Sequence, residues 1–267
     1  MISTQTASII HEPADTYHGK AKEFLSSHQL ADFRKCPMLY DRKKQGLIPD
    51  ADHTAYLIGR AAHTLILEGK EQFDREYVVG GPINPKTKKP FGKDTKAFTE
   101  WAKRQGNPVL TQAQYELLEK MAVGVAVHEE ASQILSSGIA EGVVRTVYCD
   151  VPCQIRMDWF DLQQGIVDLK TCDDLTWFEA DARRWGYAHQ MAFYRAVLHA
   201  ALDTMVSVRM IAIEKKEPHR CGVWRLTEDV LSAAQKENEA AIRRLKRCQE
   251  TDTWPSGYEE PRMFDYI

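Results

Sequence analysis

The sequence lacks the marks of an exported or membrane-bound chain. Its first 25 residues carry His11, Glu12, Asp15 and Lys20 and contain no apolar run long enough for a secretory signal. No segment approaches the ~20 consecutive apolar residues that a membrane-spanning helix needs. These absences favour a cytoplasmic protein and exclude a membrane as its partner.

Cysteine is scarce and irregularly placed. The six cysteines form no C-x-x-C pair, which argues against a disulfide framework or a zinc site and favours reduced thiols. Cys149 and Cys153 flank Val151 and Pro152, and we expect them to be buried thiols. The six positions are Cys36, Cys149, Cys153, Cys172, Cys221 and Cys248.

Two common catalytic motifs are also missing. There is no G-x-x-x-x-G-K-[ST] segment, so the chain holds no recognisable nucleotide-driven motor. There is no H-E-x-x-H segment either, and the nine histidines are scattered. An unrelated histidine-rich metal hydrolase is therefore disfavoured.

The composition is that of an ordinary globular chain. Of 267 residues, 43% are hydrophobic and 27% charged, and the formal net charge is −3. Residues 26–250 are predicted to form a single domain. Residues 1–25 are expected to be a flexible tail, or an arm on a neighbouring subunit. Residues 251–267 are an aromatic tail, expected to dock on the core or on another subunit.

Two alternating segments stand at the centre of the chain. In residues 154–160, Arg156 and Asp158 share one face, and apolar residues share the other. In residues 166–171, Asp168 and Lys170 share a face. A period of two predicts β-strands with one face in the core.

The five residues from Asp161 to Gly165 are short enough for a hairpin turn with Gly165 as a turn residue. A hairpin centred on Gln163 would place Asp158 opposite Asp168, with Cβ atoms roughly 5 Å apart. Two such carboxylates share a proton or hold a cation. The alternative is a surface hairpin with a salt bridge to Lys170.

Helices and strands alternate around this hairpin. Ser27 is expected to cap the first helix, which Pro37 kinks or splits, and Thr111 and Gln114 form a capping box. Helices are predicted over residues 27–44, 51–68, 111–137, 173–201 (in two pieces) and 227–249. Strands are predicted over residues 141–149, 151–160, 166–171, 204–213 and 222–226.

A long loop rich in proline, glycine and lysine is predicted over residues 78–96. Since the whole chain is slightly acidic, any contact with nucleic acid must come from local basic patches such as this one. The loop is either solvated or guides a nucleic-acid strand. Its basic residues are Lys86, Lys88, Lys89 and Lys93.

Short motifs in a fixed order carry a family resemblance. They are Gly59–His63 (G-x-x-x-H), the acid Asp158, Asp168–Lys170 (D-x-K) and Gln190–Tyr194 (Q-x-x-x-Y). Together they resemble the RecB-like branch of the PD-(D/E)xK nuclease superfamily. Residues 140–144 and 153–158 are similar to the C-terminal nuclease domain of RecE (exodeoxyribonuclease VIII) and to phage recombination exonucleases. The resemblance covers roughly residues 27–215.

The resemblance implies a fold and a site. The fold is α/β (α+β), with a restriction-endonuclease-like core whose central mixed sheet of about five strands is flanked by helices. His63, Asp158, Asp168 and the carbonyl of Leu169 would hold Mg²⁺, for which Mn²⁺ can substitute. The catalytic set would be Asp158, Asp168, Lys170, Gln190 and Tyr194.

Further residues have open roles. Arg156 and Tyr187 would contact DNA, together with the four lysines of the loop. Glu141 is either a supporting acid, a ligand for a second ion, or the partner of Arg156 in a salt bridge. Some RecB-like relatives carry an iron–sulfur cluster, but only Cys221 and Cys248 follow the core, far apart, so no cluster is expected.

The resemblance also implies an activity. It is digestion of linear duplex DNA from 5′ ends, leaving 3′ single strands for an annealing protein, in a bacterial or phage-infected cell. The family's ring oligomers suggest a trimer or tetramer. The alternatives are an endonuclease of the same fold, for restriction or repair, and a non-catalytic DNA-binding module.

Overall fold

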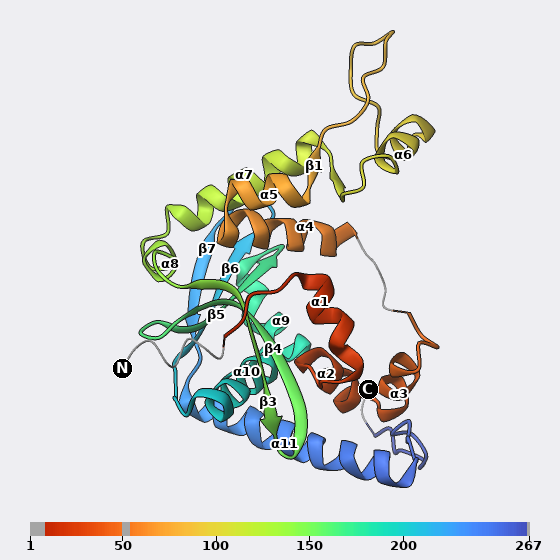
Figure 1. Ribbon diagram of the computed structural model, residues 1–267, viewed down its shortest axis with the longest axis vertical. Coiled ribbons are helices and arrows are strands. Elements are labelled where there is room, and N and C mark those ends of the chain that lie inside the picture. Colours follow the sequence, from red (N-terminus) through yellow and green to blue (C-terminus); the bar gives the residue numbers. More distant parts are fainter. Residues whose placement is uncertain (1–8, 50–53, 266–267) are drawn as a thin grey trace.

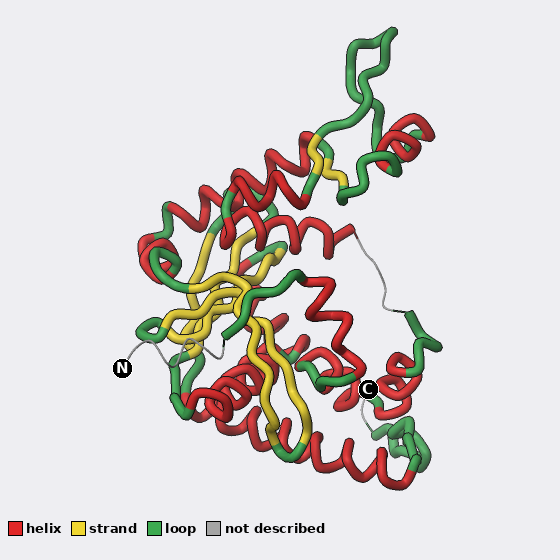
Figure 2. Tube along the Cα trace, in the orientation of Figure 1, coloured by secondary structure: helices red, strands yellow, loops and turns green. Residues whose placement is uncertain are grey.

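The computed structural model describes residues 9–49 and 54–265. Its centre is a five-stranded sheet in the order β3-β4-β5-β6-β7, antiparallel except for the parallel pair β5–β6 (Figures 1 and 2). The prediction of a mixed α/β fold built on such a sheet is confirmed. The strands are β3 (Ile139–Tyr148), β4 (Val151–Asp161), β5 (Gly165–Cys172), β6 (Val208–Glu214) and β7 (Cys221–Arg225).

One face of the sheet packs against α2 (Ser27–Lys35), α10 (Tyr187–Leu202) and α11 (Glu228–Thr251). Ile155 and Met157 of β4 enter this layer, where they join Phe193 of α10 in a fully buried cluster. The central position of α10 explains its mostly apolar surface, since a helix covered on several sides cannot keep a wide polar face.

The opposite face packs against α4 (Thr54–His63), α7 (Gln112–Ala126) and α8 (Glu129–Ile134). Val167 and Leu169 of β5 lie in this second core, which also holds Leu118 of α7. Their placement follows from the predicted two-residue alternation of the strand. β5 is thus covered on both sides.

The turn between β4 and β5 has the predicted register. Asp161 pairs with Gly165, which centres the hairpin on Gln163. The Asp161 carboxylate accepts hydrogen bonds from the backbone amides of Gln163 and Gln164. Gly165 has φ +84°, and a Cβ there would lie 2.0 Å from the carbonyl oxygen of Ser207. The position therefore requires glycine.

The prediction of a flexible tail over residues 1–25 is wrong for residues 9–25; residues 1–8 lie outside the described part. Ile10 forms a β-bridge with Val143, and Leu25 forms one with Cys153. Between them, α1 (Ala14–Gly19) buries Tyr17. The polar composition concealed three buried residues, Ile9, Tyr17 and Leu25, because seven residues separate each from the next and no continuous apolar period links them.

Several predicted helix boundaries also shift. Ser26, not Ser27, caps α2, in a capping box with Gln29, and Pro37 begins a separate helix, α3 (Pro37–Lys44). The predicted helix over 51–68 is described from Thr54 onward. The predicted helix over 111–137 breaks after Ala126, because the His128 side chain accepts a hydrogen bond from the Ala131 amide and starts α8.

Shorter elements complete the chain. The C-terminal segment docks partly: Trp254 packs against Tyr40, whereas Tyr258 and Phe264 are exposed, and residues 266–267 lie outside the described part. No helix in the described ranges has both the length and the apolar character to cross a membrane. The remaining elements are η2 (Lys20–Lys22), η3 (Thr64–Glu68), α5 (Lys70–Glu76), β1 (Val78–Val79), α6 (Lys96–Ala102), β2 (Val109–Leu110), η4 (Leu175–Trp177) and α9 (Phe178–Trp185).

Candidate active site

Three adjacent strands each carry one acidic residue at the same part of the sheet. On β3 and β4, Glu141 and Asp158 both lie between the paired residues Ala140–Trp159 and Gly142–Met157, and neither is itself paired. The pairing of β4 with β5 ends at Trp159–Val167, one residue short of Asp158 and Asp168, so the predicted direct pairing of these two acids does not form. Asp168 is only 1% exposed, and the side chains of Glu141 and Asp158 are 14% and 15% exposed. The sheet therefore gathers three carboxylates in a largely buried row.

The β-ladder opens where this row crosses it. Every residue of β3 from Ile139 to Tyr148 pairs with β4 except Glu141, which has φ +55°. Pairing between β4 and β5 stops at Trp159, and the Leu169 amide donates instead to the Asp158 carboxylate (2.8 Å). The left-handed backbone conformation of Glu141 costs on the order of 1–3 kcal/mol and persists only where the surrounding structure enforces it.

His63 belongs to α4, one of the helices drawn above the sheet in Figure 1. It is the last residue of α4, and the helix widens into the π-helical segment η3 directly after it. Its Nδ1 lies 3.5 Å from Oδ2 of Asp158, and the ring also hydrogen-bonds the backbone of Leu169. Burial lowers the pKa of this imidazole to about 4, and the charge of Lys170 adds to the effect. His63 is therefore neutral at pH 7 and can offer a ring nitrogen to a metal.

Crowding and burial make the carboxylates reluctant to ionise. Burial, followed by the charge of Asp158, raises the pKa of Glu141 to about 8. Burial raises the pKa of Asp168 to about 6 although Lys170 opposes the change. The pKa of Asp158 is raised as well, again chiefly by burial. A divalent cation would offset both the cost of burying these carboxylates in their charged form and the repulsion between them.

Lys170 lies beside Asp168, with 2.6 Å between Nζ and Oδ2. Burial alone would lower the pKa of Lys170, but the charges of Asp168 and Asp158 outweigh it and raise the pKa. Nζ also donates to Oε1 of Gln190 (3.2 Å), whose amide nitrogen donates to the hydroxyl of Tyr194 (3.3 Å). The predicted lysine, glutamine and tyrosine thus form one continuous chain of hydrogen bonds.

Arg156 pairs with Glu141 across the strands, with 2.8 Å between Nε and Oε2. This is one of the three roles that the sequence left open for Glu141. The predicted DNA contact of Tyr187 also gains a local alternative, because Nζ of Lys170 lies 4.8 Å from the centre of the Tyr187 ring. The contacts of Arg156 and Tyr187 with DNA stay predictions.

The residues present fit a divalent cation. Ligand atoms of His63, Glu141 and Asp158 lie within 4.8 Å of one another. Oδ1 of the buried Asp168 has no hydrogen-bond partner among the described residues, and Lys170 is the ion-pair partner of Oδ2. Carboxylate oxygens with one imidazole suit Mg²⁺ or Mn²⁺. The tight group includes Glu141, whereas Asp168 stands beside it in its ion pair.

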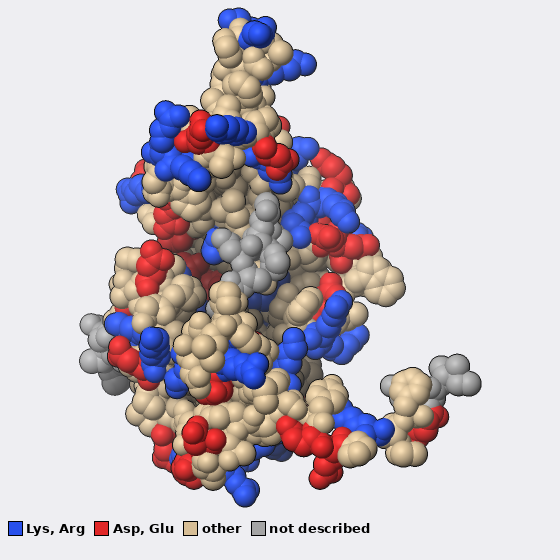
Figure 3. Space-filling model, turned by 90° about the vertical axis from the view of Figure 1, so that its right-hand side faces the viewer, with Lys and Arg blue, Asp and Glu red and all other residues tan. Residues whose placement is uncertain are grey.

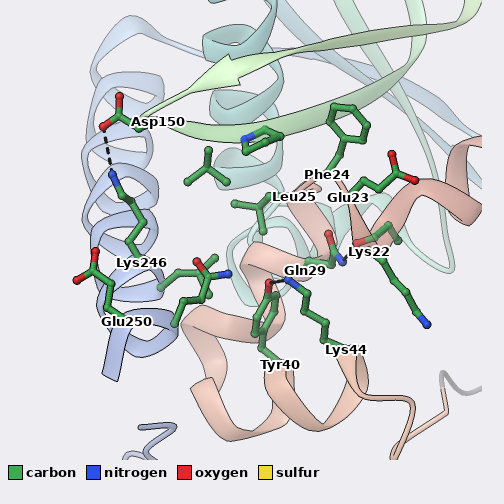
Figure 4. Close-up of a pocket in the computed structure, with 15 residues that line it drawn as sticks. Lys22, Glu23, Phe24, Leu25, Gln29, Tyr40, Lys44, Asp150, Lys246 and Glu250 are labelled. Carbon is green, nitrogen blue, oxygen red and sulfur yellow. Dashed lines mark hydrogen bonds and ion pairs between the residues drawn. The ribbon is translucent and has the colours of Figure 1, made fainter. Parts of the chain in front are cut away.

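The four predicted lysines of the 78–96 segment lie apart from these site residues, on an extension of the chain between β1 and β2. A cavity of about 370 Å³ also lies apart from the site (Figure 4). It is lined by residues of η2, α3, α11 and the β3–β4 turn and by none of the predicted site residues. Its three lysines face three acids, so its charge does not favour phosphate.

Sequence reasoning missed one residue at the margin of the site. His28, the second residue of α2, lies near enough to Lys170 and Asp168 for their charges to act on its imidazole, whose pKa is lowered chiefly by burial. A single histidine carries no spacing signal, and only the packing of α2 brings it to this margin.

Comparison with known proteins agrees with this architecture. The chain matches, over 97% of its own length and 97% of the other chain, the crystal structure of a protein from Eubacterium rectale named "Putative exonuclease", with a TM-score of 0.70 and 18% sequence identity. That identity supports the fold alone. No curated protein matches the sequence. A family model described as "PDDEXK-like domain of unknown function (DUF3799)" matches residues 26–265. The chain therefore belongs to this family of PDDEXK-like domains.

Proposed function

We propose that the protein is a metal-dependent DNA exonuclease. The family and the fold support a nuclease. The observation that carries the proposal is the convergence of three carboxylates, a neutral histidine and a lysine at one opening of the sheet. This set can hold a divalent ion and place a cation beside a phosphodiester, which is what hydrolysis of that bond needs.

In this proposal His63, Asp158, Glu141, Asp168 and the carbonyl of Leu169 hold Mg²⁺, or Mn²⁺ in its place. When bound, the ion activates a water molecule and offsets the negative charge of the phosphate. The strain at Glu141 and the raised carboxyl pKa values support the assignment, because both cost stability that metal binding returns.

Lys170 acts on the phosphate and on the attacking water. Its ammonium group is held between Asp168 and Gln190, so it needs little reorganisation to meet the charge that builds on the phosphate oxygens. Gln190 orients Lys170, and Tyr194 orients Gln190 from its buried position on α10. These two act through Lys170 and are positioning residues.

The proposed substrate is linear duplex DNA, digested from the 5′ end to leave 3′ single strands. The products would pass to a single-strand annealing protein in the cytoplasm of a bacterial or phage-infected cell. The proposed assembly is a homo-oligomeric ring of three or four copies, in which basic residues line the channel and acidic residues face outward. Polarity, assembly and annealing partner rest on the sequence resemblance to recombination exonucleases.

The test uses linear duplex DNA labelled at one 5′ or one 3′ end, with a circular duplex of the same sequence as control. Wild type and Lys170→Ala are incubated with Mg²⁺ or Mn²⁺. We expect early release of the 5′ label as mononucleotide by wild type, no loss of the circle, and no release by the variant.

Each other outcome points elsewhere. Early release of the 3′ label would reverse the polarity but keep the exonuclease. Internal cuts in the linear DNA and loss of the circle would indicate an endonuclease. Intact DNA with both proteins under both metals would reject catalysis and leave a DNA-binding module.

A further inference from the structure

The charge of this chain is unevenly distributed. Residues 80–108, between β1 and β2, contain seven lysines and arginines and two acids, a net charge of +5. Since the whole chain carries −3, the remaining residues carry −8. We call residues 80–108 the basic projection. A protein with this imbalance presents one strongly cationic surface on an acidic body.

The basic projection stands away from the body of the protein. It rises beyond the layer of α4, α5 and α7 in Figure 1, and blue side chains gather at its tip in Figure 3. Its first part is a hairpin: Ile83 forms a β-bridge with Pro90, and the Asn84 amide donates to the Lys89 carbonyl. The Asn84 side chain closes the turn by accepting from the amides of Lys86 and Thr87. The predicted loop is thus a shaped, two-armed element.

Four lysines of the projection do not stabilise the fold through any ion pair within the described part of the chain. Lys86, Lys88, Lys89 and Lys93 are all exposed, and none forms an ion pair among the described residues. By contrast, Lys96 of α6 has Glu100 3.7 Å away. Four like charges on one short element repel one another, which costs stability unless an anionic partner relieves it.

We infer that the basic projection binds the phosphate backbone of duplex DNA and holds it while the proposed active site cuts it. The inference deepens the proposed function and rests on it. Lys86, Lys88 and Lys89 are gathered on the tight turn of the hairpin, and a duplex carries one phosphate charge per about 1.7 Å of its axis, so this compact group can meet several phosphates at once. Lysine is a compact point charge without the planar fork that reads bases, so the contact is independent of sequence.

The projection belongs to the same layer as the catalytic histidine. β1 follows α5, α5 follows η3, and η3 continues directly from His63. DNA held by the projection is therefore tethered to the layer that covers the acids, within one chain. Retention of DNA would then not depend wholly on closing a ring of several copies.

The test measures binding separately from cutting. In a Lys170→Ala background without divalent metal, fluorescence anisotropy measures the equilibrium constant for binding of a labelled DNA duplex. The measurement is repeated at salt concentrations between about 50 and 300 mM, a range over which the effect of counterion release is resolved. One variant carries Lys86→Gln, Lys88→Gln, Lys89→Gln and Lys93→Gln. Its matched control carries Lys22→Gln, Lys236→Gln, Arg243→Gln and Arg247→Gln, which remove the same charge from exposed positions on η2 and α11.

We expect the projection variant to lower the slope of log affinity against log salt by about 3 to 4, since each phosphate contact contributes roughly one. The matched control should change the slope by less than about one. Equal changes in both variants would reduce the effect to net charge and overturn the inference. An unchanged slope in the projection variant would overturn it as well.

Two further readouts separate the remaining outcomes. If the wild-type protein neither binds DNA nor cuts it when divalent metal is supplied, the proposed function itself fails. If it binds and cuts DNA but the projection lysines leave the salt slope unaltered, only this inference fails. Light scattering gives the mass of each variant: a projection variant that falls to a smaller oligomer would assign the lysines to contacts between copies and overturn the inference.

Discussion

Two buried carboxylates on neighbouring strands behave in opposite ways. Asp168 on β5 and Glu214 at the end of β6 are 1% and 3% exposed. Glu214 accepts hydrogen bonds from the Leu175 amide and from the backbone and guanidinium of Arg220, which, with the side-chain contact first, hold its pKa at about 2. Asp168 forms an ion pair with Lys170, its carboxylate oxygens have no other hydrogen-bond donor within the described part of the chain, and burial raises its pKa to about 6.

The difference separates a structural acid from a functional one. The hydrogen-bond donors around Glu214 match its carboxylate oxygens and join β6 to the segment after β5. Among the described residues, this network therefore leaves no hydrogen-bonding group of Glu214 free for a ligand. Around Asp168, together with Glu141 and Asp158, the carboxylates outnumber the hydrogen-bond donors. The folded chain therefore keeps carboxylate groups there whose negative charge is not fully compensated. Burial alone does not indicate function; burial with unmet hydrogen-bonding capacity does.

The largest expected effect is on catalysis at Asp168. Asp168→Asn should lower the rate of DNA hydrolysis roughly 10³-fold, because it removes a ligand charge and the partner of Lys170. Its free energy of unfolding should stay within about 1 kcal/mol of wild type, since the loss of the Lys170 ion pair is offset by the removal of a buried carboxylate that is costly to ionise. Hydrolysis rates and urea denaturation measure the two. A variant that unfolds easily would place Asp168 in the same structural class as Glu214.

Metal binding should stabilise only the site with unmet charge. At a Mn²⁺ concentration of about 100 Kd, linkage adds about 2.7 kcal/mol to the stability of wild type. For a chain of this size that raises Tm by roughly 5–10 °C. Asp158→Asn should lose most of this shift, because the Asp158 carboxylate lies 3.5 Å from His63 and shares one group of ligand atoms with His63 and Glu141. Differential scanning calorimetry with and without metal checks this, and an equal shift in both proteins would place the metal elsewhere.

The structural acid should show the reverse pattern. Glu214→Gln should lower the free energy of unfolding by about 2 kcal/mol, because charge-assisted hydrogen bonds to Arg220 and to the backbone are lost. Its rate of DNA hydrolysis at saturating metal should stay near that of wild type. Denaturation curves and end-label assays give both values. A collapse of activity without loss of stability would contradict the comparison.

The same acid predicts a pH dependence of stability. The folded pKa of Glu214, about 2, is depressed below the ordinary value of 4.5. Its contribution is therefore fully present above pH 4.5 and is lost as the pH falls through 4.5 toward 2, where the folded carboxylate takes up a proton. The Tm values of wild type and of Glu214→Gln should therefore approach each other as the pH falls through this window. A constant difference down to pH 2 would reject the depressed pKa.

The smallest effect on catalysis should come from Gln190 and Tyr194, which act on the site through Lys170. Gln190→Ala should lower kcat about tenfold, about 1.4 kcal/mol, because Lys170 loses a fixed acceptor. Tyr194→Phe should lower kcat less, since the hydroxyl acts one hydrogen bond further away. KM should be nearly constant in both variants, as measured by steady-state kinetics. An increase in KM with unchanged kcat would assign Gln190 to DNA binding.

The sequence by itself determined the strands and the hairpin that hold Asp158, Asp168 and Lys170. Alternation with a period of two and a five-residue turn are local signals, and they give the register without knowledge of the rest of the chain. The motif order also placed Gln190 and Tyr194 on one helix face, four residues apart, where a helix brings side chains together.

Only the tertiary structure decided the rest. The packing of α4 on the sheet brings His63 to Asp158, and the strained backbone at Glu141 draws its carboxylate into the same group. Both contacts join residues far apart in sequence, so no local period encodes them. Burial of Ile9, Tyr17 and Leu25 likewise needs the finished sheet as its surface. Long-range packing overrides local composition because the apolar area it buries outweighs the preferences of single residues.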